Sequence, residues 1–169
     1  MRRLFACCLF VVAAAVQAQP FPEGPAAHHR TVGGWEVESA AEDDGVVVRM
    51  SRTRGDYALE YSLAYWRGNY SVPRASHASR GGTLCGGAPE RVDYGVQLPA
   101  AQVRGELAEA LAACGASERE AAAILRGFAP AYRLLSRWAA EAEAATAAEA
   151  AAIADYGRDP PATQAGEPH

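Results

Sequence analysis

The chain has 169 residues, with 16 basic residues, 20 acidic residues and a formal net charge of −4 at pH 7. Every basic side chain is arginine, which excludes Schiff-base catalysis, pyridoxal phosphate attachment and the usual lysine-containing phosphate loop. An acidic chain without a basic cluster along its sequence is also a poor binder of nucleic acid or of an anionic membrane surface.

Residues 1–18 have the three parts of a secretory signal peptide. A basic start precedes an apolar run over residues 4–16, and small residues at Val16 and Ala18 flank Gln17. The run is shorter than the roughly 20 apolar residues needed to cross a membrane, so we expect cleavage after Ala18 and no membrane span. The mature protein is then periplasmic or secreted, with a charge of about −6 after the loss of two arginines.

A proline-rich segment over residues 19–30 predicts an extended lead-in, and the folded domain is expected to occupy residues 31–156. Alternating apolar and polar residues predict strands at 34–39, 46–53, 57–66 and 91–98. A shorter strand at 70–72 is expected to end at Pro73. Residues 75–89 are rich in glycine, serine and alanine and predict a long loop, with a functional role and simple mobility both left open.

The apolar period becomes helical after residue 100. A first helix is expected to end at Gly115, and Ser117 with Glu120 predicts a capping box for a second. Pro130 suits the first turn of a third helix, which runs into an alanine tract over residues 139–154. Residues 157–169 are expected to be a disordered tail. The fold class is therefore α+β, with a small antiparallel sheet of three to five strands followed by two or three C-terminal helices.

Two cysteines remain after signal cleavage, Cys85 and Cys114. An even count in an oxidising compartment predicts a disulfide between them. The alternatives are two free thiols, or Cys85 as a nucleophile activated by His77. A disulfide and a catalytic thiolate exclude each other.

Short motifs favour structural interpretations. The Arg54-Gly55-Asp56 triplet is typical of a hairpin turn, and the adjacent His28 and His29 lack nearby ligands at metal-binding spacing. No cofactor and no metal site is predicted.

Aromatic residues concentrate in the strand half, and most should pack beneath the helices. The remainder predict a binding surface for a protein or cell-wall partner in the envelope, and the expected function is a non-enzymatic binding, inhibitor or accessory module. One alternative is a small hydrolase with its site at His77 in the glycine-rich segment. Another is a structural protein that assembles through its alanine-rich helix. The residues predicted to form the binding surface are Trp35, Trp66, Arg67, Tyr70 and His77.

Overall fold

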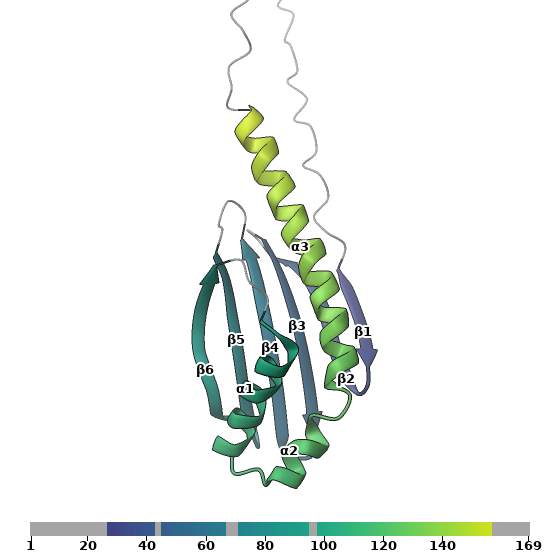
Figure 1. Cartoon of the computed structure of the whole chain (residues 1–169), viewed down its shortest axis with the longest axis vertical. Coiled ribbons are helices and arrows are strands. Elements are labelled where there is room, and N and C mark those ends of the chain that lie inside the picture. Colours follow the sequence, from purple (N-terminus) through teal and green to yellow (C-terminus); the bar gives the residue numbers. More distant parts are fainter. Residues whose placement is uncertain (1–26, 43–44, 67–70, 95–97, 157–169) are drawn as a thin grey trace, which may run out of the picture.

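Six strands form one antiparallel sheet in which each strand pairs with the next strand along the chain (Figure 1). The computed structural model describes residues 27–42, 45–66, 71–94 and 98–156. Within these ranges three helices follow the sheet, so the predicted α+β class is confirmed, with one strand more than the predicted maximum of five. The strands are β1 (His28–Val32), β2 (Trp35–Glu42), β3 (Gly45–Arg54), β4 (Tyr57–Trp66), β5 (Ser71–Arg80) and β6 (Thr83–Tyr94).

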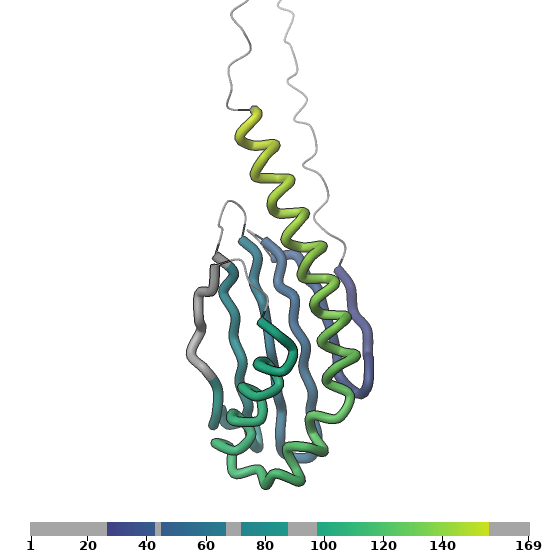
Figure 2. Tube along the Cα trace, viewed as in Figure 1, coloured from purple at the N-terminus to yellow at the C-terminus, as the bar shows by residue number. Residues whose placement is uncertain are grey.

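The helices α1 (Ala100–Ala113), α2 (Glu118–Ile124) and α3 (Phe128–Tyr156) cover one face of the sheet. Helix α1 contacts β4, β5 and β6, while α3 contacts β1, β2, β3 and β4. The short α2 lies at one end of the sheet, and α3 extends past the opposite end (Figures 1 and 2). Within the described ranges, no helix combines the length and the apolar character that a membrane span requires.

Strand alternation places the core between the sheet and the helices. In β4, every second residue from Tyr57 to Tyr65 is buried, while the residues between them are only partly covered. The inward residues of β2 and β3 meet apolar side chains of α1 and α3 in one cluster. The opposite side of the sheet, covered by no described helix, is here called the open face; it includes Glu38, Arg49, Ser62, Ala75, Glu60 and His77, which the strand register places on one side.

The prediction of a loop over residues 75–89 is wrong. These residues instead form most of β5, a turn at Gly81 and Gly82, and the first half of β6. Both turn glycines have positive φ, 57° and 79°, as a type I′ hairpin turn requires. The small residues also have a packing role, because a Cβ on Gly86 would lie 2.2 Å from the carbonyl oxygen of Ala110 in α1. Gly86 therefore permits the close approach of α1 to the edge strand β6.

Two further boundaries differ from the sequence prediction. Strand β1 begins at His28, inside the predicted lead-in, because the Gly33–Gly34 turn folds this segment back onto β2 and His28 stacks on Trp138 of α3 at 5.4 Å. Strand β5 continues through Pro73, where a strand end was expected. The register between β4 and β5 stops at Arg74, so the missing N–H of Pro73 removes no bond to β4.

The predicted capping box is confirmed at the start of α2, where Ser117 and Glu120 bond each other's backbone N–H reciprocally. Several predictions lie outside the described residues. These are the signal peptide over 1–18, the lead-in before residue 27, Arg67 and Tyr70 of the predicted binding surface, and the tail over 157–169.

Candidate functional site

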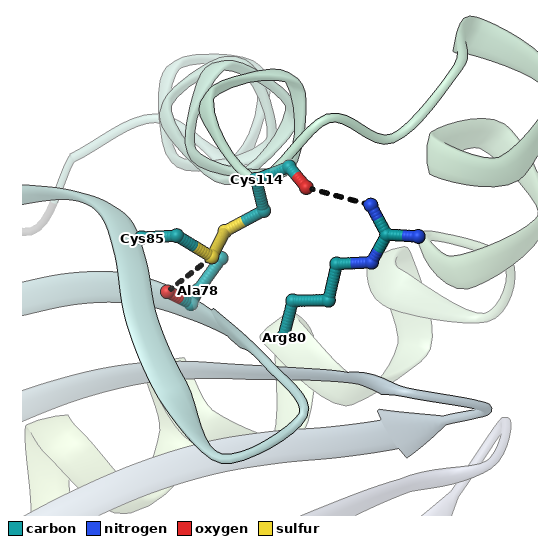
Figure 3. Close-up of a disulfide and its surroundings, with 4 residues drawn as sticks. All are labelled: Ala78, Arg80, Cys85 and Cys114. Carbon is teal, nitrogen blue, oxygen red and sulfur yellow. Dashed lines mark hydrogen bonds between the residues drawn. A yellow bond between two sulfur atoms is a disulfide. The ribbon is translucent and has the colours of Figure 1, made fainter.

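Cys85 and Cys114 are joined by a disulfide, in agreement with the pairing expected from the sequence (Figure 3). The sulfur atoms are 2.05 Å apart and the two Cα atoms 5.0 Å apart. The bond links β6 at the edge of the sheet to the C-cap residue of α1. In this oxidised state Cys85 has no thiolate to offer, so the structure gives the Cys85 nucleophile alternative no support.

Trp35 was predicted on a binding surface, and this placement is wrong. It points inward from β2, with none of its surface exposed. Its indole Nε1 donates a hydrogen bond to the carbonyl oxygen of Arg126 at 3.1 Å, and its ring meets Phe128 edge to face. Trp35 therefore anchors the segment between α2 and α3 to the sheet.

Trp66 and His77 both lie on the open face, but far apart. His77 pairs in register with Glu60, six residues along β4 from Trp66. At about 3.3 Å per residue this separation is roughly 20 Å. Among the described residues, no carboxylate lies within ion-pair distance of His77, so the hydrolase alternative also lacks support at this histidine.

A pocket of about 510 Å³ opens at the end of the sheet beside α2. We call it the arginine pocket, because three elements each contribute an arginine to it: Arg54 from the end of β3, Arg80 from the end of β5, and Arg119 from α2. The remaining lining residues are Gly55, Asp56, Tyr57, Glu120, Ala123 and Ile124.

Two of the three guanidinium groups are held in place. Arg54 Nη1 donates a hydrogen bond of 2.7 Å to the carbonyl oxygen of Ala123 in α2. The Arg80 guanidinium lies 5.2 Å from the centre of the Tyr57 ring, and its Nη1 donates to the carbonyl oxygen of Cys114 at 3.5 Å (Figure 3). Each group retains further N–H donors, since a guanidinium carries five.

Positive charge accumulates around the pocket. Arg52, two residues before Arg54 along β3, donates to the carbonyl oxygens of Gly33 and Arg126. Partial burial lowers the pKa of Arg52, and the charges of Arg54 and Arg126 lower it further. Arginines at this end of the molecule therefore repel one another.

The acidic residue Glu120 offsets this charge only in part. Its Oε2 accepts hydrogen bonds from the backbone N of Ser117 at 2.8 Å and from the Ser117 Oγ at 2.6 Å. These bonds hold the pKa of Glu120 below its usual range. The carboxylate thus completes the capping box of α2, in which Ser117 is the N-cap, and stays ionised.

A second polar cluster lies between the sheet and α1, away from the pocket. Arg74, only 4% exposed, donates to Glu106 Oε2 at 2.7 Å, and Ser76 lies beside the same carboxylate. The Tyr61 hydroxyl is buried nearby in register with Ser76, and it has no hydrogen-bond partner among the described residues. Burial raises the pKa of Tyr61. This cluster fixes α1 on the sheet and shares no residue with the lining of the arginine pocket.

Sequence reasoning missed the arginine pocket. Its arginines come from three separate segments, and no run of basic residues marks them. The available signal was the Arg54-Gly55-Asp56 turn, which the sequence correctly assigns to a hairpin without revealing what lies beside it. Within the described ranges, no group of three or more His, Cys, Asp or Glu residues is placed to hold a metal ion. Comparison of the chain with family models, curated proteins and solved structures finds no match.

Proposed function

We propose that this chain is an exported envelope protein that acts as a non-enzymatic binding module and recognises a protein partner through the arginine pocket. The single observation that carries the proposal is the convergence of Arg54, Arg80 and Arg119 on one pocket in an otherwise acidic chain. A concave site with a few convergent polar groups is the usual form of a binding site.

The chemistry of the lining favours recognition over proton transfer. Guanidinium groups stay protonated at physiological pH, so they bind anions and do not act as general acids or bases. Glu120 is already engaged in the capping box with Ser117, and the hydrogen bonds that lower its pKa also make it a weaker proton acceptor. The same groups are well suited to hold a negatively charged partner.

Site-specific photo-crosslinking in the producing cell tests the proposal. A benzophenone amino acid replaces Ala123, which lines the pocket, and in a second strain it replaces Ser62 on the open face. We expect one discrete protein adduct from position 123 and none from position 62. The adduct should disappear when Arg119→Gln is added and persist with Arg104→Gln, which removes an exposed arginine of α1 outside the pocket.

The results that contradict the proposal are equally concrete. An adduct from position 62 alone would move the binding surface to the open face, which carries Trp66 and His77. No adduct from either position would remove the support for a binding module. An adduct from position 123 that survives Arg119→Gln would show that the arginines do not select the partner.

A structural role is the second candidate, and one observation favours it. The C-terminal part of α3 extends past the sheet (Figure 1), and Ile153 within it is 63% exposed. An exposed large apolar residue on an unsupported helix suits pairing with another helix. Light scattering after size-exclusion chromatography distinguishes the candidates: self-association that Ile153→Ser abolishes supports assembly, and a monomer at all concentrations argues against it.

A further inference from the structure

We infer that the arginine pocket binds a single side-chain carboxylate of an acidic peptide segment, presented by the partner protein in an extended or turn conformation. The inference rests on the proposed function and adds the chemical class of the ligand. It is carried by the charge balance of the lining, by the arrangement of the guanidinium groups and by the composition of the remaining walls.

The charge balance of the lining favours an anion. Three arginines and two acidic residues line the pocket, which leaves a net charge of +1. Asp56 in the β3–β4 turn and Glu120 in α2 offset the arginines only in part. The surrounding arginines Arg52 and Arg126 add to the attraction without lining the pocket.

Two of the three guanidinium groups are arranged before any ligand arrives. Arg54 is fixed to α2 through Ala123, and Arg80 is held between the Tyr57 ring and the end of α1. The β5–β6 turn is tied to the β3–β4 turn by a hydrogen bond of 2.8 Å from Gly81 N to Asp56 O. Planar guanidinium forks suit a carboxylate, and groups held in advance lose less conformational entropy on binding.

The remaining walls suit a peptide. Ala123 is the half-buried apolar residue of the lining, since Tyr57 and Ile124 are only 7% and 2% exposed, and Gly55 borders open space, because a Cβ at this position would have no atom within 4 Å. A peptide can place its acidic side chain on the arginines while its backbone passes over Ala123 and Gly55. An inorganic anion would use only the charges.

The test is calorimetric titration of the full chain, with its disulfide intact, against four probes. The first is a blocked peptide rich in Asp and Glu, the second the same peptide with Asn and Gln in their places, the third its Lys-rich counterpart, and the fourth inorganic phosphate. We expect the acidic peptide to bind best. We also expect Arg119→Gln to weaken it about tenfold or more, as loss of a charge-assisted hydrogen bond predicts.

Arg104→Gln is the matched control, because it removes the same charge from an exposed position on α1. Its effect should stay below about twofold, and binding of the acidic peptide should weaken with added salt. An equal loss of peptide affinity in both variants would mean that only the net charge of the protein matters, and it would overturn the inference.

The outcomes separate the inference from the proposed function. Phosphate or the amide peptide could bind more tightly than the acidic peptide and still require Arg119. This result would refute the inference that the ligand is a carboxylate, but the pocket would remain a binding site. If none of the four probes binds while the Ala123 crosslink is formed, the inference fails and the binding module stands. If neither probe binding nor the crosslink is observed, both fail.

Discussion

Opening the Cys85–Cys114 bond should lower the stability of the protein more than any single surface substitution. The two cysteines are 29 residues apart, and the chain-entropy model assigns a loop of this length about 3.5 kcal/mol of stabilisation through the unfolded state. For a chain of this size, that corresponds to a fall in melting temperature of roughly 7–14 °C.

Three samples separate the cross-link from local packing. The reduced wild type and the Cys85→Ser variant should lose the same amount of stability, since Cys85 is exposed and its replacement disturbs no core packing. Cys114 is only 6% exposed, so Cys114→Ser also buries a hydroxyl and should cost about 1 kcal/mol more. The assay is thermal unfolding followed by circular dichroism, with and without a thiol reductant.

Two results would refute this reasoning. A melting temperature that moves by less than about 3 °C on reduction would mean that the cross-link contributes little. Intact mass spectrometry of the non-reduced protein that finds two free thiols would mean that the bond does not form in the cell.

Other perturbations test the packing and the caps. Tyr61→Phe should leave stability unchanged or raise it, because the buried hydroxyl has no partner among the described residues; a loss above about 1 kcal/mol in urea unfolding would contradict this. Gly33→Ala should lower the free energy of unfolding by about 1–3 kcal/mol more than Gly55→Ala. Both glycines have positive φ, but only a Cβ on Gly33 would meet backbone, 2.8 Å from the carbonyl oxygen of Gly127. Equal losses of stability in the two variants would refute the close contact. Glu120→Ala should destabilise the protein at neutral pH. Because hydrogen bonds to Ser117 lower the pKa of Glu120, its stabilisation is present above the ordinary glutamate range and is lost as the pH falls through the lowered pKa; a difference in melting temperature that persists in strong acid would contradict the cap.

The sequence predicted the elements whose pattern follows from local rules. Alternation in residues 57–66 identified β4, and the Ser117–Glu120 spacing identified the start of α2. The disulfide followed from the cysteine count and the expected compartment. Each of these features depends on a few neighbouring residues or on composition.

The β5–β6 hairpin could not be recognised in the same way. Gly86 carries no side chain because α1 packs directly on this part of the sheet, where a Cβ would meet the backbone of Ala110. That requirement arises from a helix encoded later in the chain, so the local composition resembles that of a loop. The same reason hid the burial of Trp35, whose partners Arg126 and Phe128 are contributed by the C-terminal half.

The candidate site was beyond sequence reasoning for a related cause. Arg54, Arg80 and Arg119 meet only because two hairpin ends and α2 lie at the same end of the sheet. The residues of the predicted binding surface do not lie together in the structure. Trp35 is in the core, and Trp66 and His77 lie at distant points of the open face. The net charge of the whole chain does not reveal that three arginines gather at one end of the sheet.

The most direct test of the central claim is a map of where the acidic peptide binds. Backbone amide resonances of the isotope-labelled protein are followed by nuclear magnetic resonance as the blocked Asp- and Glu-rich peptide is added. We predict that the shifts concentrate at residues 54–57, at Arg80 and at residues 119–124, and that Arg119→Gln removes them. Shifts that concentrate instead on the open face, around Ser62 and His77, would contradict the assignment of the arginine pocket as the binding site.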